Sequence, residues 1–248
     1  MKFYRRLTKI KAISFDLDDT LYSNKPVMLA IEKKMIVYFA GLAVLKHQVS
    51  AQHKVLDSRF WSFFRHQAIL KQADLAQDVV KVRLVTYCLG FLSLGLTENI
   101  ATQQAQAALN YFIQLRSDFS VPEQSKKLLA NLSKKYPLIA ISNGNVDTKA
   151  IGISQYFQHV YHAGWQDDDS LLKQKPASDM FSLACQQLAI KPSQLLHVGD
   201  CGRADIQGAL LAGCQAAWLS CYDVGKPITV LPHIEMTLVS QLEQFLLG

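Results

Sequence analysis

Residues 12–20 read Ala-Ile-Ser-Phe-Asp-Leu-Asp-Asp-Thr, a short apolar run that passes into three aspartates. A run of this kind is typical of a buried parallel strand, here expected over residues 12–17. Ligands of open α/β sheets bind at the carboxyl ends of the strands, and on a strand Asp16 and Asp18 would point to the same side. Such carboxylates repel each other unless a cation joins them, and their hard oxygens favour Mg²⁺. An acidic turn without a ligand is the plainer alternative.

Similar apolar runs recur later in the chain and alternate with stretches of helical periodicity. This alternation predicts a doubly wound α/β fold, a parallel sheet with helices on both faces. The further strands are expected at 138–142, 159–162, 195–199 and 215–219, and the helices between them at 123–135, 177–189 and 204–212.

Residues 23–118 differ, because they show long helical periodicity and no convincing strand. Pro26 suits the first turn of a helix that runs to about Lys46, and Ser50 and Thr97 are candidate caps for later helices. Three or four helices are therefore inserted after the first strand. We expect a discontinuous Rossmann-like catalytic core, residues 1–21 and 120–248, and a helical cap, residues 22–119.

The composition is that of an ordinary globular chain, since 50% of the 248 residues are hydrophobic and 19% are charged. No apolar run is long enough to span a bilayer, and no signal core follows the basic start. The five scattered cysteines favour reduced thiols over disulfides or a zinc site. We therefore expect a cytoplasmic protein without a membrane partner.

A formal charge of +6 favours anionic partners. The basic residues are spread along the chain and are not interleaved with aromatic residues, so nucleic acid is not expected among the partners. Phosphorylated small molecules also qualify as anionic partners, and a solvated basic surface is the plainer interpretation of the charge.

Three further polar stretches each follow an apolar run or a loop. Ser142 and Asn143 could offer a hydroxyl and backbone N–H groups to phosphate oxygens, although a plain Ser-Asn-Gly turn has the same letters. Lys175, before Pro176 at the expected start of a helix, could supply a fixed positive charge, or could be a surface lysine. Asp200 and Asp205 stand at another strand end, where burying two carboxylates without a purpose would be costly.

These motifs, Asp-Leu-Asp-Asp-Thr, then Ser142, Lys175-Pro176 and Gly199-Asp200 with Asp205, occur in an order that resembles the haloacid dehalogenase-like hydrolase superfamily. The resemblance covers essentially the whole core and places a helical insert where that superfamily has its first type of cap. Further stretches, such as 15–22, 137–145, 175–181 and 231–235, resemble one bacterial branch. That branch includes the phosphatase acting on FMN and on the riboflavin precursor 5-amino-6-(5-phospho-D-ribitylamino)uracil.

The resemblance implies a phosphatase reaction in which Asp16 attacks phosphorus and becomes an aspartyl phosphate. Asp18 then acts as the general acid and later as the base. Ser142, the backbone of Asn143 and Lys175 are expected to bind the phosphoryl oxygens.

The same resemblance implies Mg²⁺ as the cofactor. Asp16, the backbone carbonyl of Asp18, and Asp200 are expected to hold the ion, and Asp205 is expected to steady this shell of ligands.

Several alternatives stay open from the sequence. A dehalogenase of the same superfamily also uses the first aspartate but lacks the second acid, so Asp18 argues against it. A phosphomutase, a phosphatase of sugar or nucleotide phosphates, and a non-catalytic binding protein are further alternatives.

Five other features are interpreted as follows. The aromatic segment 59–65 is interpreted as packing inside the cap rather than as a ring-binding surface. His197 is interpreted as a core histidine, Cys201 as a passive thiol, and Arg203 as a possible phosphate clamp. The acidic run 167–169 is interpreted as a solvated loop.

Overall fold

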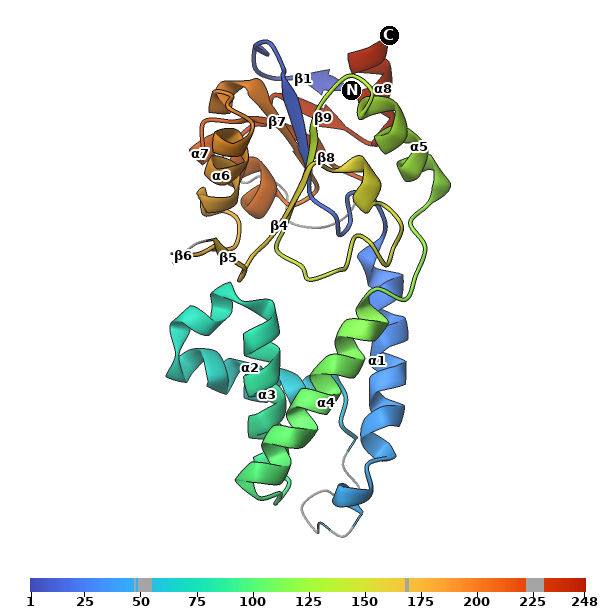
Figure 1. The fold of residues 1–248 in the computed structure, drawn as a ribbon, viewed down its shortest axis with the longest axis vertical. Helices are drawn as coiled ribbons and strands as arrows, with labels where there is room; N and C mark the ends of the chain where they lie inside the picture. The colour runs from blue at the N-terminus through green and yellow to red at the C-terminus, as the bar shows by residue number, and fades with distance from the viewer. Residues whose placement is uncertain (47, 49–54, 168–169, 222–229) are drawn as a thin grey trace. The chain divides into compact units, whose positions relative to one another are not determined.

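The structure, a computed structural model, describes residues 1–46, 48, 55–167, 170–221 and 230–248. The chain divides into two compact units. The first, called the core, combines Met1–Asn24 with Phe119–Gly248, and the second, called the helical insert, is Lys25–Asp118. Figure 1 shows the core as strands covered by helices and the insert as helices. In the described parts of the chain, no helix combines the length and apolar character that crossing a bilayer requires.

The core is built on a sheet of seven strands. They are β1 (Lys2–Phe3), β2 (Ala12–Phe15), β3 (Leu138–Ser142), β4 (His159–His162), β7 (Leu195–Gly199), β8 (Gln215–Leu219) and β9 (Ile234–Met236). Their order across the sheet is β1-β9-β8-β7-β2-β3-β4. β2 lies inside the sheet, with β3 and β4 on one side of it and β7, β8 and β9 on the other. The strand order therefore reverses at β2. A reversal of this kind leaves a crevice at the carboxyl end of the strand where it occurs.

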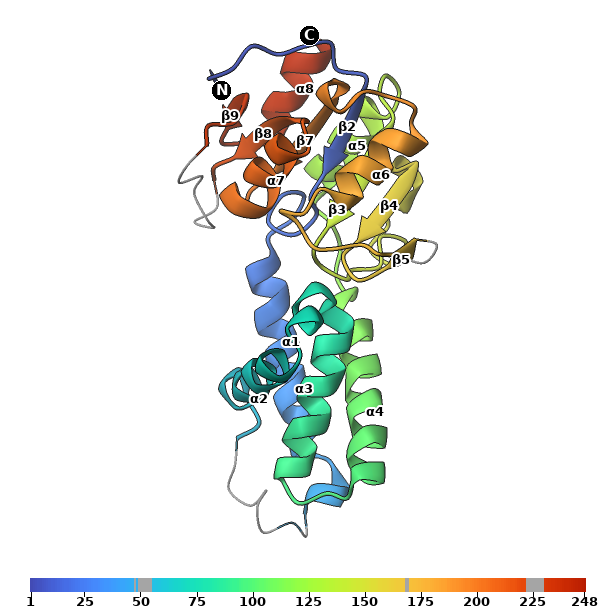
Figure 2. The same cartoon turned by 90° about the vertical axis from the view of Figure 1, so that its left-hand side faces the viewer.

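Helices cover both faces of this sheet (Figure 2). Ile13 and Phe15 of β2 pack in one apolar cluster with leucines of α5 (Glu123–Leu132) and α8 (Ser240–Leu247). Ala12, which alternates with them, packs on the opposite face with α6 (Asp179–Gln187) and α7 (Gly208–Leu211). Burial on both faces explains why β2 reads as a continuous apolar run. The predicted doubly wound α/β fold is confirmed.

Several predicted boundaries are wrong. β2 ends at Phe15, since the chain turns at the aspartates that follow, and α5 and α6 are shorter than predicted. The predicted helix 204–212 begins instead as a turn of π-helix, η6 (Gly202–Gln207), which continues as α7. The sequence reading also missed β1, β9 and a separate antiparallel pair, β5 (Gln166–Asp167) with β6 (Ser170–Leu171), because such short strands carry little periodicity.

The helical insert contains four α-helices in its described residues. They are α1 (Asn24–Ala40), α2 (Ser58–Lys71), α3 (Val79–Ser93) and α4 (Glu98–Arg116), with short 3-10 turns η1 (Ala43–Leu45) and η3 (Ala73–Gln77). The first helix therefore ends before the predicted Lys46. Asp57 and Asp78 cap α2 and α3, because each accepts two backbone N–H bonds of the first turn. Thr97 precedes α4 without a side-chain cap bond, and the predicted cap Ser50 lies outside the described residues.

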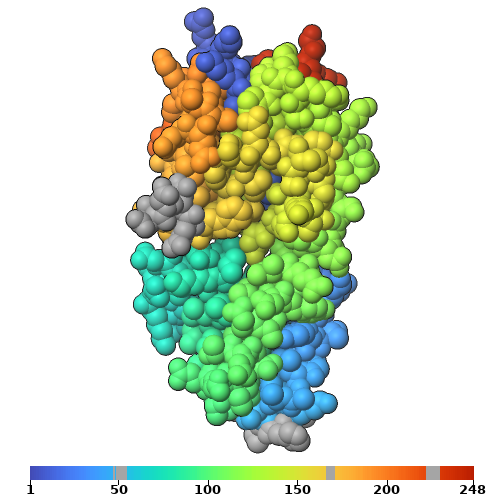
Figure 3. Space-filling view, viewed as in Figure 1, coloured from blue at the N-terminus to red at the C-terminus, as the bar shows by residue number. Residues whose placement is uncertain are grey.

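Aromatic side chains hold the helices of the insert together. Tyr38 of α1 stacks on Tyr111 of α4 with 4.9 Å between ring centroids, and these two helices lie side by side in Figure 3. The Trp61 ring of α2 lies 4.6 Å from that of Phe39 and 4.9 Å from that of Tyr87, and its indole N–H donates to the Leu56 carbonyl at 3.1 Å. Trp61 therefore packs inside the insert.

Gly90 on α3 should be a sensitive point of this packing. A Cβ there would come within 2.3 Å of Trp61 Cζ3. Alanine gains roughly 0.5–1 kcal/mol over glycine in a helix, but overpacking costs about 1–3 kcal/mol. We expect Gly90→Ala to lose about 1–2 kcal/mol of unfolding free energy and to lower the Tm by a few degrees.

The control for this prediction is Gly41→Ala. Its Cβ would meet only backbone oxygens at 3.5 Å, so the Tm should hardly change. Thermal denaturation followed by circular dichroism measures both variants, and an unchanged or higher Tm for Gly90→Ala would contradict the packing argument.

Candidate active site

Asp16 stands at the carboxyl end of β2 with its side chain buried. After it the chain turns through Asp19, which has a φ of 55°, a conformation that aspartate tolerates better than most residues. Asp18 thus lies beyond the strand, and its Oδ1 accepts a hydrogen bond from the Tyr22 hydroxyl at 2.9 Å. The period-two argument for Asp16 and Asp18 does not apply, because the turn rather than the pleat sets the direction of Asp18.

The buried Lys175 ammonium lies beside Asp16. Its Nζ donates to Asp16 Oδ1 at 2.6 Å, to Asp205 Oδ1 at 2.7 Å and to the Ile141 carbonyl at 2.6 Å. An ammonium has three N–H donors, so all of them are directed to protein acceptors. Lys175 does not open a helix, as the sequence suggested, because α6 begins only at Asp179.

Asn143 holds the loop that carries Lys175. Its side-chain amide donates to the Lys175 carbonyl at 3.0 Å and accepts from the Lys175 N–H at 2.7 Å. Neighbouring Ser142 is buried at the end of β3, and its hydroxyl oxygen accepts from the Gly144 N–H at 2.9 Å. The sequence assigned only the backbone of Asn143 to the site, whereas the structure also gives its side chain a positioning task.

Asp205 belongs to η6 but reaches back to the end of β7. Its Oδ2 accepts from the Cys201 N–H at 2.9 Å, and a Cβ on Gly199 would lie only 2.2 Å from its carboxyl carbon. Glycine is therefore required at Gly199 for this close approach.

Asp200 follows Gly199 directly and is buried. The Thr20 hydroxyl donates to Asp200 Oδ1 at 3.3 Å, and the Trp218 indole N–H donates to the Asp200 carbonyl at 2.7 Å. Thr20, the last residue of the opening motif, thereby connects the end of β2 with the end of β7.

Asp16, Asp200 and Asp205, called here the carboxylate cluster, each place one oxygen within 4.8 Å of the other two. All three are buried, and Asp18 and Asp19 add further negative charge nearby. Among the described residues, Lys175 is the one cation that forms an ion pair with the cluster, because the His197 ring beside Asp205 is neutral. Buried oxygens in this excess over positive charge fit a hard divalent cation such as Mg²⁺.

Burial and the excess of negative charge raise the pKa values of two carboxyl groups of the cluster. Burial raises the pKa of Asp16 well above its ordinary value, Lys175 opposes this rise, and Asp205 and Asp18 reinforce it. Burial, together with the charges of Asp205 and Asp19, raises the pKa of Asp200 to about 7. Both carboxyl groups therefore favour a bound cation, which would offset the cost of ionising them.

Lys175 and Asp205 form a buried ion pair in which both groups stay charged. Burial alone would lower the pKa of Lys175, but Asp16 and Asp205 outweigh it and raise that pKa, so the ammonium stays charged. Burial would raise the pKa of Asp205, but Lys175 and the hydrogen bond from His197 outweigh it and hold that pKa below its ordinary value.

His197 has more contacts with the site than the core-histidine interpretation implied. Its Nε2 lies 3.1 Å from Asp205 Oδ1 and its Nδ1 lies 2.9 Å from Ser14 Oγ, the residue opposite it on β2. Burial lowers its pKa, so the ring is neutral near pH 7. Since a carboxylate only accepts, Nε2 carries the hydrogen and Nδ1 accepts from Ser14. No sequence signal pointed to this role, because the contact joins distant positions.

Three remaining features do not join the cluster. Arg203 is exposed, and no described hydrogen bond or ion pair connects it with the carboxylates. The Cys201 thiol accepts from the Ala204 N–H at 3.4 Å, which is a local contact. Of the acidic run 167–169, residues 168 and 169 lie outside the described residues.

The His197 contacts lead to a stability prediction. His197→Leu should lose about 1–3 kcal/mol of unfolding free energy, because Asp205 and Ser14 each lose a buried partner. His197→Gln should lose less, since its amide N–H can replace the donor to Asp205. Urea denaturation measures both variants, with His159→Leu, a half-buried histidine on β4, as a control. Equal losses for the leucine and glutamine variants would show that only the bulk of the ring matters.

Comparison with known proteins shows the family of this chain. A family model described as a haloacid dehalogenase-like hydrolase matches residues 10–213. The chain is 34% identical over 254 residues to the 5-amino-6-(5-phospho-D-ribitylamino)uracil phosphatase YigB of Escherichia coli (strain K12), with 98% of each chain covered. It is 26% identical to the N-acylneuraminate-9-phosphatase of Rattus norvegicus, over 97% of this chain and 95% of that relative.

A solved structure is also similar. The crystal structure of a 2-haloacid dehalogenase from Pseudomonas syringae pv. Tomato DC3000 matches with a TM-score of 0.83 at 25% sequence identity. The match covers 96% of this chain and 98% of that one.

Proposed function

The chain belongs to the haloacid dehalogenase-like hydrolase family and is a phosphatase, and we propose that it hydrolyses small phosphate monoesters with Mg²⁺ through an aspartyl phosphate on Asp16. One observation carries this proposal. The Asp16 carboxylate is buried at the end of the central strand, beside the Lys175 ammonium and two further carboxylates. This arrangement supports a role for Asp16 as the nucleophile beside a fixed positive charge and a cation site.

The residues would divide the reaction as follows. Lys175 binds Asp16 Oδ1, which leaves the second oxygen of Asp16 to attack phosphorus in line with the ester oxygen. The new O–P bond forms as the ester P–O bond breaks, and the leaving alkoxide takes a proton from Asp18. Asp18 then removes a proton from the water that cleaves the aspartyl phosphate, which restores both carboxyl groups.

The phosphoryl group would be held by donors at the end of β3. The Ser142 hydroxyl and the Asn143 backbone N–H stand at the end of β3. Lys175 acts through its charge, because its N–H donors are already directed to protein acceptors. Stabilising the negative charge spread over the phosphoryl oxygens is most of what a protein does in this reaction.

The carboxylate cluster fits a Mg²⁺ ion that Asp16, Asp200 and the backbone carbonyl of Asp18 would hold. Asp205 would keep Lys175 and the surrounding charges in place. When bound, the ion supplies positive charge to the phosphoryl oxygens.

A dehalogenase is the main alternative, since one similar structure carries that description. Halide needs no proton when it leaves, whereas an alkoxide does, and Asp18 is present to supply one. The more similar YigB and the N-acylneuraminate-9-phosphatase are both phosphatases by name. These observations support phosphate ester hydrolysis over halide displacement.

For the substrate, we propose FMN and 5-amino-6-(5-phospho-D-ribitylamino)uracil, and the relative at 34% identity supports the second by name. A panel of phosphorylated metabolites that includes both compounds tests this choice. Faster turnover of sugar or nucleotide phosphates would contradict it, and transfer of phosphate between sugar positions would indicate a phosphomutase.

The free cysteines support a reducing compartment such as the cytoplasm.

Substitution of the two aspartates Asp16 and Asp18 should impair the reaction at different steps. Asp16→Asn should abolish turnover of p-nitrophenyl phosphate, because an amide is a poor nucleophile. Asp18→Asn should lower kcat by about 10²–10⁴-fold and let phosphoenzyme accumulate. Asp74→Asn, the same change at an exposed position of the insert, should leave kcat unchanged. Phosphoenzyme trapping and steady-state kinetics measure these effects, and a loss below about tenfold for Asp18→Asn would remove its acid/base role.

Mg²⁺ binding should weaken in acid. Asp200 has a pKa of about 7, so it carries a proton at pH 6 that the cation must displace. We expect the Mg²⁺ dissociation constant to rise by about tenfold from pH 8 to pH 6. Calorimetry can measure it, and Trp218 beside Asp200 offers a fluorescence signal.

The Mg²⁺ measurement has two controls. EDTA should abolish hydrolysis and added Mg²⁺ should restore it, and Glu98→Gln on the insert should leave the pH dependence unchanged. Equal affinity at both pH values would contradict the proposed role of Asp200.

A further inference from the structure

The end of β4 is joined to the loop that follows β3, residues 142–144, called here the β3 loop. β4 is the last strand on this side of the sheet, and its final residue, His162, is in register with Ser142, the final residue of β3. The Ala163 N–H then donates to the Ser142 carbonyl at 3.0 Å. The carboxyl ends of these two strands therefore lie side by side (Figure 2).

His162 holds the β3 loop through its side chain. The ring is buried, and its Nδ1 lies 2.8 Å from the Gly144 carbonyl oxygen. Because a carbonyl oxygen only accepts, Nδ1 carries the hydrogen of this bond. A side chain of β4 thus fixes a main-chain group beyond the end of β3.

The other main-chain group of Gly144 orients the Ser142 hydroxyl. The Gly144 N–H donates to the hydroxyl oxygen of Ser142 at 2.9 Å. A hydroxyl has one hydrogen and two lone pairs, so this bond occupies a lone pair and leaves the hydrogen for another acceptor. In the proposed reaction that acceptor is a phosphoryl oxygen. Displacement of Gly144 would therefore misdirect the Ser142 hydroxyl.

Asn143 connects the same loop with the segment of Lys175. Its side-chain amide makes two hydrogen bonds with the Lys175 main chain, at 2.7 and 3.0 Å. The β3 loop therefore positions the Ser142 hydroxyl, the Asn143 backbone N–H and the segment that carries the buried ammonium. All three groups are assigned to the phosphoryl group in the proposed reaction.

The turn after β4 restricts the His162 ring. The ring centroids of His162 and Trp165 are 4.6 Å apart. The Trp165 N–H donates to the His162 carbonyl at 3.2 Å, and the Trp165 carbonyl accepts from the Leu172 N–H at 2.8 Å. A side chain whose rotamer is fixed by such packing can hold its hydrogen-bond partner in a defined place.

From these contacts we infer that His162 is a positioning residue for phosphate binding, which sets the geometry of the β3 loop through the Gly144 carbonyl while Trp165 restrains its ring. The inference rests on the proposed function, because that function assigns Ser142 and Asn143 to the phosphoryl oxygens. His162 acts through the loop and makes no contact with the substrate.

Substitutions that keep, move or remove the ring donor test this role. His162→Asn keeps an N–H near the place of Nδ1, His162→Gln moves it to the place of Nε2, and His162→Leu removes it. The readout is the inhibition constant of inorganic phosphate against p-nitrophenyl phosphate. It should rise by about tenfold in the glutamine and leucine variants, because the Gly144 carbonyl loses its donor and the loop moves. His162→Asn should stay close to the wild-type protein.

The Mg²⁺ dissociation constant distinguishes positioning from a general loss of structure. The proposed ligands Asp16 and Asp200 follow β2 and β7, so Mg²⁺ affinity without phosphate should be the same in every variant. His159→Leu, a half-buried histidine at the start of β4, is the control and should change neither constant. Circular dichroism and Tm verify that each variant is folded at the assay temperature.

Three results would overturn the inference. They are wild-type phosphate affinity in His162→Gln, an equal loss in His162→Asn and His162→Gln, or a fall in Mg²⁺ affinity as large as the fall in phosphate affinity. The asparagine and glutamine pair decides the matter even where His162→Leu does not fold.

Ser142→Ala distinguishes this inference from the proposed function. Weaker phosphate binding in Ser142→Ala, without an effect in His162→Gln, overturns the inference alone. An unchanged inhibition constant in Ser142→Ala contradicts the proposed phosphate site, and the inference with it.

Discussion

Taking the Lys175 ammonium out of water costs several kcal/mol, and the core is arranged so that three acceptors offset this cost. Asp16 reaches Nζ from the end of β2, the Ile141 carbonyl from within β3, and Asp205 from the turn that follows β7. These strands are neighbours in the sheet, in the order β7-β2-β3. A change of strand order or register would separate the acceptors, so the topology of the sheet and the charge at its edge depend on each other.

One ammonium nevertheless leaves the carboxylate cluster short of positive charge. The raised pKa values of Asp16 and Asp200 express this shortage, and the lowered pKa of Asp205 shows where Lys175 has already met it. A protein selected only for stability would avoid such a cluster. In the proposed reaction, a bound Mg²⁺ would supply the missing positive charge and would share it with the phosphoryl oxygens.

The fold could be predicted from the sequence where it depends on local motifs or on periodic apolar patterns. The buried strands read as apolar runs, and the order of Asp16, Ser142, Lys175 and Asp200 placed the site at their ends. The contacts that support the site could not be predicted, because they join positions far apart along the chain. His197 meets Ser14 and Asp205 only once β7 lies beside β2. The π-helical start of η6, which carries Asp205, likewise has no signal in the sequence.

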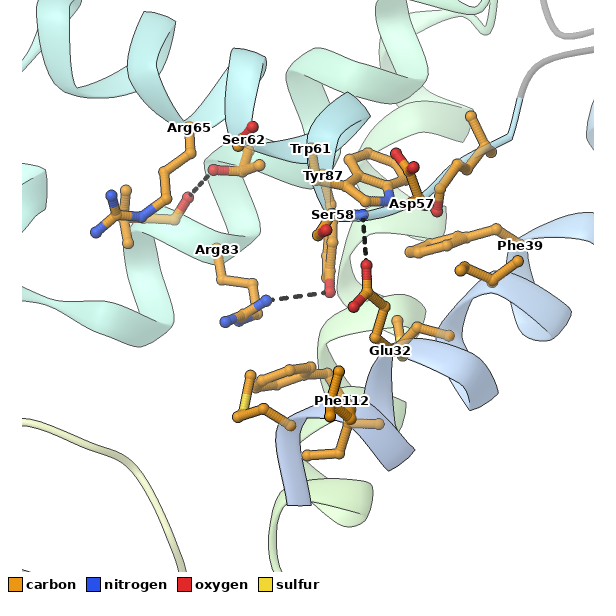
Figure 4. Close-up of a pocket in the computed structure, with 18 of the residues that line it drawn as sticks. Glu32, Phe39, Asp57, Ser58, Trp61, Ser62, Arg65, Arg83, Tyr87 and Phe112 are labelled. Carbon is orange, nitrogen blue, oxygen red and sulfur yellow. Dashed lines mark hydrogen bonds between the residues drawn. The ribbon is translucent and has the colours of Figure 1, made fainter. Parts of the chain in front are cut away.

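The helical insert also depends on contacts between residues that are far apart in the sequence, but no sequence motif marks them. Arg83, Tyr87 and Glu32 belong to two helices, and any one of them read alone is an ordinary helical residue. Only the packing of α1 against its neighbours brings their donors and acceptor to one cavity beside an apolar wall (Figure 4). In the core, the chemistry of phosphate transfer restricts the residues so tightly that their order is recognisable in the sequence. Reaction chemistry can therefore be predicted from the sequence of this chain, whereas the lining of the cavity in the insert is set only by the packing of its helices.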